Sequence, residues 1–442
     1  MRIGGLLLWS LAVSTLVTAQ ADDPKDLLLR FRNNVLQTLT RLPKYMCTQS
    51  IDRSSYELDS ALRLRGYLQL PPSSCDEALA TKSRARLTLA RSDRLRLDVA
   101  AIGRSNEIYS GVGEARFDNG DLFQLVRQGA IQKGGFSGFL ASIFEGGAAS
   151  FSYNGDTTVH GRPLAEFGFE VPLEKSNYVF SDRHEQVITG YSGTFLVDPH
   201  SLDLVQLVIR TNNLREVSAC QATTTLDYGR VRLNDSSFLL PSETQLDIVY
   251  VDGSQEENRT VFSACHEFLG ESTVSFGEPP LESGAAVGKV STSEPRALPP
   301  GLRFELAFTQ PIDTAVAAAG DRISAKLTSA IREGSSNKIL VPKGSLVTAR
   351  IMKMERISGP PSSVIIAVKL ETVDVGGARR PFAATLSSNI KTFEKQSNLP
   401  RRVALGSFDT LEAGSGAFEF REVPEDYVIP TGFQSGWTTA AP

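Results

Sequence analysis

Two histidine–glutamate pairs offer the start of a metal-binding motif. His184-Glu185 and His266-Glu267 each match the first two positions of the zinc-protease pattern H-E-x-x-H. That pattern sets its histidines four residues apart on one helix face, so that both bind the same zinc ion. Neither pair has a second histidine at that spacing. We therefore expect no zinc-protease site, and a packed or hydrogen-bonded role for His266.

Motifs for a nucleophile and for a phosphate are also incomplete. Ser335 and Lys338 have the S-x-x-K spacing, but they lie in a Gly/Ser loop instead of at a helix start. Residues 284–289 are one residue short of a phosphate loop and lack the Ser or Thr that must follow. No G-x-S-x-G nucleophile elbow is present. The sequence therefore predicts a protein without catalytic residues, without a cofactor and without enzymatic activity.

A basic stretch is a candidate anion site. The stretch contains Arg84, Arg86, Arg91, Arg94 and Arg96. On strands, Arg84 and Arg86 share one face, as do Arg94 and Arg96. Two such neighbouring strands would form an arginine-rich sheet face. This face either binds an anion or a lipid headgroup, or it is a solvated face. In the second case the arginines pair with nearby carboxylates, including those of Asp93 and Asp98.

One short apolar segment is the candidate for lining a ligand cavity. Its large side chains recur at helical spacing and comprise Phe136, Phe139, Leu140, Ile143 and Phe144. Pairs of glycines flank the segment and could let it move. The segment is either a movable apolar flap or a short helix that plugs the core.

The four cysteines indicate disulfides. Cys47, Cys75, Cys220 and Cys265 contain no C-x-x-C knuckle, which a four-cysteine zinc site needs. Four cysteines allow three pairings. The shortest sequence separations favour Cys47–Cys75 and Cys220–Cys265.

The first 21 residues have the pattern of a cleaved secretory signal. Residues 1–21 contain Arg2, an apolar run and small residues before the expected cleavage site. The run is too short to cross a bilayer core of about 30 Å, and no later segment is long enough. We expect a periplasmic or secreted protein with no membrane-spanning segment after cleavage. The net charge of −4 gives no overall basis for binding nucleic acid.

The rest of the chain predicts a mainly β protein with two β domains. Residues 22–276 begin with a helix near residues 26–42 and continue as an antiparallel curved sheet with a few helices. Residues 277–300 are rich in Pro, Gly and Ser and predict a linker. Residues 301–436 again alternate and predict a β-barrel or sandwich, and residues 437–442 predict a frayed tail.

The first domain resembles a known family of carriers. The pattern lies in residues 193–199, residues 204–207, Leu240-Pro241 and the strands around Val249 and Phe262. Over residues 80–276 it resembles the antiparallel half-barrel of periplasmic lipoprotein-carrier and lipoprotein-receptor proteins, and of related anti-sigma-factor regulators. This resemblance implies a curved sheet with helices on its concave side, around an apolar cavity for acyl chains.

The second domain resembles a different family. Residues 298–302, 311–313, 319–321, 339–345 and 349–351 occur in the order seen in the β-barrel domain of TrbI-type conjugation and secretion-channel proteins. That resemblance, over residues 298–436, implies a barrel that packs beside others in the envelope. The combined layout also resembles uncharacterised secreted proteins of acidobacteria.

Two functions fit these observations. The first is a non-enzymatic exported envelope protein that acts as a binding or scaffold module for a partner protein or another envelope component. The alternative is a carrier or sensor of a lipid or acylated ligand in the N-terminal half-barrel. A continuous apolar concave face, beyond what packing needs, would distinguish the second from the first.

Overall fold

The computed structural model describes most of the chain after the signal segment. The described residues are 23–58, 72–80, 87–102, 107–112, 131, 137–182, 185–212, 214–267, 298–334, 336–359, 361–387, 403–405, 415–424 and 426–441. The predicted signal, Phe136, Ser335, most of the predicted linker, and Arg84 and Arg86 lie outside them.

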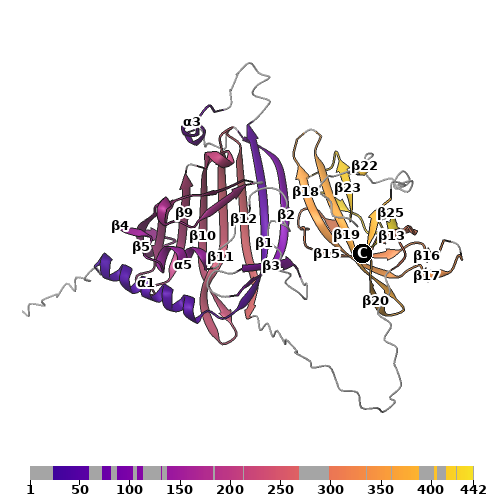
Figure 1. The fold of residues 1–442 in the computed structure, drawn as a ribbon, viewed down its shortest axis with the longest axis horizontal. Helices are drawn as coiled ribbons and strands as arrows, with labels where there is room; N and C mark the ends of the chain where they lie inside the picture. Colours follow the sequence, from indigo (N-terminus) through magenta and orange to yellow (C-terminus); the bar gives the residue numbers. More distant parts are fainter. Residues whose placement is uncertain are drawn as a thin grey trace, which may run out of the picture.

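The protein is mainly β, as predicted, and its N-terminal region is one curved antiparallel sheet (Figure 1). The sheet order is β4-β5-β8-β9-β10-β11-β12-β1-β2-β3. Its strands are β1 (Tyr45–Leu58), β2 (Leu87–Ala101), β3 (Glu107–Gly111), β4 (Ser150–Val159), β5 (Arg162–Val171), β8 (Tyr191–Val197), β9 (Leu204–Asn212), β10 (Ala219–Leu233), β11 (Ser236–Tyr250) and β12 (Gln255–Glu267). A separate hairpin joins β6 (Val179–Asp182) and β7 (Glu185–Ile188).

Helix α1 (Pro24–Arg41) lies against this sheet, as Figure 1 shows. The Asp23 carboxylate accepts a hydrogen bond from the Lys25 amide, and Pro24 occupies the first turn, where its missing N–H costs nothing. The buried stripe of this helix comprises Leu27, Phe31, Val35 and Leu39.

Short helices complete this region. They are α3 (Cys75–Ala80), α5 (Gly138–Phe144) and the 3₁₀ turns η2 (Leu173–Lys175) and η3 (Arg215–Val217). Helix α5 corresponds to the predicted apolar helical segment and contacts α1. No helix among the described residues is long and apolar enough to span a membrane.

The C-terminal strands continue the N-terminal sheet through a pairing with β2, and they wrap around a core of their own. Their order is β21-β25-β13-β15-β18-β19-β23-β22, with β20 also paired to β19. These strands are β13 (Arg303–Phe308), β15 (Arg322–Leu327), β18 (Leu346–Ile357), β19 (Ser363–Val375), β20 (Ala378–Pro381), β21 (Ala384–Leu386), β22 (Val403–Leu405), β23 (Ser415–Arg421) and β25 (Gln434–Thr439). Two small ladders pair β14 (Ile312–Asp313) with β24 (Val428–Ile429) and β16 (Ile331–Arg332) with β17 (Ile339–Val341).

The prediction of a frayed tail from residue 437 is wrong. Trp437 is fully buried in the C-terminal core, and β25 continues to Thr439. The Thr439 hydroxyl donates a hydrogen bond to the Pro299 carbonyl, and its oxygen accepts one from the Leu302 amide. The end of the chain is therefore held by the beginning of the same region.

The predicted disulfide pairing is also wrong. The structure joins Cys47 to Cys265 and Cys75 to Cys220. Strands β1 and β12 are far apart in sequence but adjacent in the sheet, which brings the first pair together. The second pair ties α3 to the start of β10. Sequence separation failed as a guide because the sheet places its first and last long strands side by side.

Candidate functional site

A pocket of about 490 Å³ opens beside α5. That volume falls within the range of small-molecule sites, about 300–1,000 Å³. Residues of α5, of the segment after it, of the η2 turn and of β8 line the pocket: Gly138, Phe139, Ala141, Ser142, Glu145, Gly146, Ala148, Lys175, Asn177, Tyr178 and Tyr191. The N-terminal region therefore contains a hollow of ligand size at the predicted apolar helix.

The core below α5 fixes that helix in place. Phe144 meets Phe31 of α1 edge to face, with ring centroids 5.4 Å apart, and meets Phe195 of β8 at 5.3 Å. The Arg32 Nε of α1 donates a hydrogen bond of 2.7 Å to the Phe144 carbonyl. A cationic donor at the last carbonyls of a helix stabilises that end. Helix α5 is thus anchored to α1 by a buried ring and a capped carbonyl.

Three aromatic rings line the pocket, and the ring of Tyr178 contacts the other two. The Phe139 and Tyr178 centroids lie 5.5 Å apart, and those of Tyr178 and Tyr191 also lie 5.5 Å apart. The Tyr191 hydroxyl donates to the Ser142 Oγ at 3.0 Å, and that oxygen donates to the Phe139 carbonyl at 3.0 Å. These two hydrogen bonds join β8 to α5 beside the pocket.

The two tyrosines are neutral at physiological pH, and burial raises the pKa of both further. It raises the pKa of Tyr178 to about 12, with a smaller contribution from neighbouring Tyr191. Burial also raises the pKa of Tyr191, against the opposing effect of its hydrogen bond to Ser142. Neutral rings present an electron-rich face without a net charge.

The solvent side of the pocket carries charged and polar groups. Glu145, Lys175 and Asn177 are exposed residues that also line the pocket. Charges of both signs therefore meet a ligand at the opening, whereas the three rings meet it farther in.

The predicted lining residues divide into two groups. Phe139 lines the pocket, whereas Leu140, Ile143 and Phe144 belong to the core shared with α1. Phe136 lies outside the described residues, so its role stays a prediction. We expected the segment to be a movable flap or a helix that plugs the core. Its buried side chains pack in the core, as in the second alternative, and one side of the helix borders the pocket.

Sequence reasoning missed Tyr178, Tyr191 and Lys175. Tyr191 begins a strand that we predicted only from Gly193, and Tyr178 precedes the β6–β7 hairpin in an irregular segment. Their aromatic type was the available signal, but no periodicity linked them to α5. Only the fold brings these segments together.

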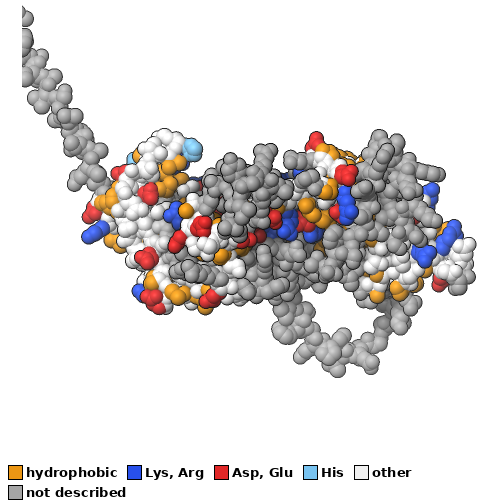
Figure 2. All heavy atoms as spheres, turned by 90° about the horizontal axis from the view of Figure 1, so that it is seen from above, with side chains coloured by type: hydrophobic (Ala, Val, Ile, Leu, Met, Phe, Trp, Pro, Cys, Tyr) orange, Lys and Arg blue, Asp and Glu red, His pale blue; other side chains and the backbone are white. Residues whose placement is uncertain are grey.

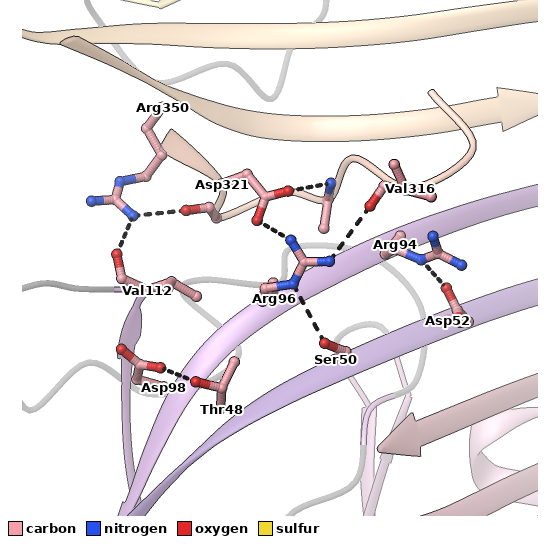
Figure 3. A network of polar contacts seen from close by, with 12 residues as sticks. Thr48, Ser50, Asp52, Arg94, Arg96, Asp98, Val112, Val316, Asp321 and Arg350 are labelled. Carbon is pink, nitrogen blue, oxygen red and sulfur yellow. Dashed lines mark hydrogen bonds and ion pairs between the residues drawn. The ribbon is translucent and has the colours of Figure 1, made fainter. Parts of the chain in front are cut away.

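The described arginines of the basic stretch pair with carboxylates, as one of the two predicted alternatives required, but some of these carboxylates come from the C-terminal region. Arg94 pairs with Asp52, and Arg96 pairs with Asp321 (Figure 3). Arg94 also donates a hydrogen bond to the Ala315 carbonyl. These guanidinium groups join the two regions of the molecule. We name this contact the β2 seam, comprising residues 90–96 and the C-terminal segments that they touch.

The carboxylates expected to pair with these arginines have other partners. Asp93 pairs with Arg53, and Asp98 accepts a hydrogen bond from the Thr48 hydroxyl. On the face in Figure 2, Lys and Arg side chains are interspersed with Asp and Glu side chains. This arrangement does not support a basic anion-binding face at Arg94 and Arg96.

His184 lies outside the described residues, so the structure bears only on the motif at His266. The His266 Nδ1 lies 2.9 Å from the Ala264 carbonyl oxygen, in agreement with a hydrogen-bonded histidine. Across the ranges that the structure describes, no group of three His, Cys, Asp or Glu side chains could hold a metal ion.

Comparison with known proteins gives only distant likenesses. No family model and no curated protein matches the chain. A putative outer membrane lipoprotein-sorting protein domain from Vibrio parahaemolyticus is similar at 9% identity and a TM-score of 0.27, over 55% of this chain and 94% of that chain. A DUF1329 family protein from Desulfovibrio piger has 8% identity and a TM-score of 0.25, over 56% and 92%.

A third structure is a LolA superfamily protein from Nitrosomonas europaea, with 7% identity and a TM-score of 0.23, over 54% of this chain and 91% of that chain. Scores and identities this low do not indicate what this chain binds. None of the three supports the resemblance to conjugation-channel or acidobacterial proteins.

Proposed function

We propose that this protein is an exported, non-enzymatic binding protein that carries or senses a lipid or acylated ligand in the pocket beside α5. The observation behind the proposal is the pocket of about 490 Å³, which combines three aromatic rings with a charged rim. An amphipathic ligand fits both parts, because its apolar portion leaves water against the rings while its headgroup stays with the charges.

The strength of such binding follows from the apolar surface that the ligand buries. Each buried methylene contributes about 0.8 kcal/mol. Ten methylenes therefore contribute about 8 kcal/mol, which corresponds to micromolar affinity before the cost of association is subtracted. Contacts between the headgroup and the rim then decide whether the complex persists.

The covalent frame of the N-terminal region supports an exported protein. Both disulfides lie in it, and such bonds persist in oxidising compartments. The predicted signal at residues 1–21 points the same way. A periplasmic or secreted location is therefore part of the proposal.

The scaffold interpretation has less support than the carrier. It rested on the lack of catalytic motifs, on export and on the linker, and these features do not identify a surface for a partner. The pocket, in contrast, is a hollow that packing alone does not require.

Native mass spectrometry of the protein purified from a periplasm without detergent tests the proposal. We expect an additional mass in the lipid range that organic extraction removes. A clean apo mass after gentle purification, together with no uptake of added fatty acid, would contradict the carrier function.

A pair of variants locates the ligand. Ala148→Trp places an indole into the pocket from a half-buried lining position, and it should abolish the extra mass. Ser150→Trp, two residues away at an exposed position outside the lining, should retain it. Equal retention by both folded variants would place the ligand elsewhere.

A further inference from the structure

The composition of the pocket wall is more specific than a general apolar site requires. Among the described lining residues, every apolar side chain larger than alanine is aromatic. The branched aliphatic side chains near α5, Leu140 and Ile143, point into the core instead. Aliphatic side chains would line a site for alkyl chains equally well, so the aromatic lining indicates a ligand that interacts with ring faces.

The rings form a tilted wall. Phe139 is inclined at 40° to Tyr178, and Tyr178 at 55° to Tyr191, with both centroid distances at 5.5 Å. A ligand beside Tyr178 therefore meets more than one ring. Ring faces carry negative potential and attract a cation within about 6 Å of the centroid.

Two charges complement this wall. Glu145 adds a negative charge at the pocket, which favours a cationic group next to the rings. Lys175 also lines the pocket and would repel a simple cation. A ligand that carries a phosphate beside its ammonium group meets both charges favourably, because the phosphate faces Lys175.

Resting on the proposed function, we infer that the pocket recognises a zwitterionic headgroup of the phosphocholine class, with a quaternary ammonium group against Phe139, Tyr178 and Tyr191 and a phosphate toward Lys175. Neutral tyrosine hydroxyls suit this role, since the rings attract the cation without a permanent countercharge. Asn177 at the opening supplies an amide donor for the phosphate oxygens.

Isothermal titration of the exported protein with two probes tests the inference. The first probe is phosphocholine, and the second is 3,3-dimethylbutyl phosphate, in which carbon replaces the ammonium nitrogen at nearly the same shape. Apolar burial is equal for the two, so a difference in Kd reports the attraction of the cation. We expect phosphocholine to bind about tenfold more tightly or better. Equal affinities, or no saturable binding of phosphocholine, would overturn the inference.

Three variants assign the parts of the site. Tyr178→Leu should remove the preference for phosphocholine over 3,3-dimethylbutyl phosphate, while Tyr153→Leu, at an exposed tyrosine outside the lining, should retain it. Lys175→Met should weaken phosphocholine several-fold without weakening choline, which has no phosphate. Circular dichroism confirms that each variant is folded. Loss of the preference in Tyr153→Leu, or its retention in folded Tyr178→Leu, would contradict the assignment.

Two further measurements distinguish a lipid from a free headgroup as the ligand, and separate this inference from the proposed carrier function. Dihexanoyl phosphatidylcholine below its micellar concentration should bind more tightly than phosphocholine if the natural ligand is a lipid, and equally if it is a free headgroup. A protein that retains an extractable lipid mass yet binds both isosteres equally would remain a carrier without headgroup selectivity. Absence of any retained mass, with phosphocholine preferred, would leave the headgroup site and remove the lipid-carrier function.

Discussion

The β2 seam is filled with paired groups, whereas the pocket beside α5 is a hollow between rings. At the seam, β18 pairs with β2 in antiparallel register from Glu355↔Asp93 to Ile357↔Arg91. The Arg96 amide donates to the Ala319 carbonyl at 2.7 Å, and the Ala319 amide donates to the Arg94 carbonyl at 2.8 Å. The C-terminal region therefore covers a part of the β2 edge that would otherwise expose unpaired backbone groups.

The seam also contains a buried cation. Arg350 is almost fully buried, and its Nε donates to Glu371 at 2.6 Å. Its Nη1 donates to the carbonyls of Gly320, at 2.8 Å, and Val112, at 3.2 Å (Figure 3). A buried charge with such a set of partners is costly to disturb.

This contrast shows how similar sequence signals acquire different roles. Arginines on a strand and aromatics on a helix both suggested binding. The guanidinium groups at the seam are used to join two parts of one chain, while the rings at α5 border open space. We infer that a charged cluster at a sheet edge is a structural contact when its partners come from the same chain, and that a candidate site needs room for a ligand.

The largest effect is expected from Gly320→Ala, because the backbone of the β2 seam leaves no room for a side chain at this position. Gly320 has a φ of +104°, and a Cβ there would lie 2.0 Å from the Arg96 carbonyl oxygen. Gly320→Ala should therefore cost about 3 kcal/mol of unfolding free energy, from backbone strain and forced separation of the seam. Denaturant unfolding measures the loss, and hydrogen exchange at the Ala319 amide should show that the seam opens.

A second glycine provides the matched control. Gly344 has a φ of +88°, but nothing lies within 4 Å of its Cβ position. Gly344→Ala should cost only the backbone strain, about 1 kcal/mol. Equal losses in the two variants would mean that the close approach at the seam contributes nothing. Ligand binding at α5 should be unchanged in both.

The next effect concerns the pocket at high pH. The pKa of Tyr178 is near 10.0 when unfolded and about 12 when folded. Below pH 10 both states hold the proton, so its contribution to stability is fully present. Between pH 10 and 12 the unfolded state ionises first, so stability falls, by up to about 1.4 kcal/mol per pH unit. Unfolding curves across this range measure the fall.

Tyr178→Phe should reduce that fall, because phenylalanine has no proton to lose. The C-terminal region supplies a comparison, since burial also raises the pKa of Tyr427 to about 12. Tyr427→Phe should reduce the fall by a similar amount without changing the pocket. An identical pH profile for Tyr178→Phe and the native protein would show that the tyrosine is solvated when folded.

Local patterns predicted much of the fold. The helix near residues 26–42, the alternating strands and the short apolar helix were readable because each depends on periodicity within one segment. Three features could not be predicted from local patterns: the disulfide pairing, the burial of Trp437 and the partners of Arg94 and Arg96. Each depends on which distant strands become neighbours. Of the pocket, only Phe139 was predicted, because the other rings come from segments that the fold brings to α5.

A smaller effect is expected from the hydrogen bond that joins β8 to α5. Tyr191→Phe removes the donor to Ser142 while keeping the ring. Loss of one such bond costs about 1 kcal/mol. We expect faster hydrogen exchange in α5 and a retained preference for phosphocholine over 3,3-dimethylbutyl phosphate. Ser142→Ala should add little further loss in the double variant, whereas fully additive losses would indicate that the two hydroxyls act separately.

The smallest effect is expected for the ion pair between Arg96 and Asp321. Both side chains are partly exposed, at 31% and 20%, so solvent screens their attraction. A double-mutant cycle with Arg96→Met and Asp321→Asn should give a coupling of about 0.5–1 kcal/mol that shrinks as salt is added. The backbone hydrogen bonds that join Ala319 to Arg94 and Arg96 remain in every variant. Hydrogen exchange at the Ala319 amide should therefore remain slow. If removal of this ion pair alone opened the seam, the two regions would be held together by charge instead of by strand pairing. The difference between the seam and the pocket would then be one of electrostatics and not of available space.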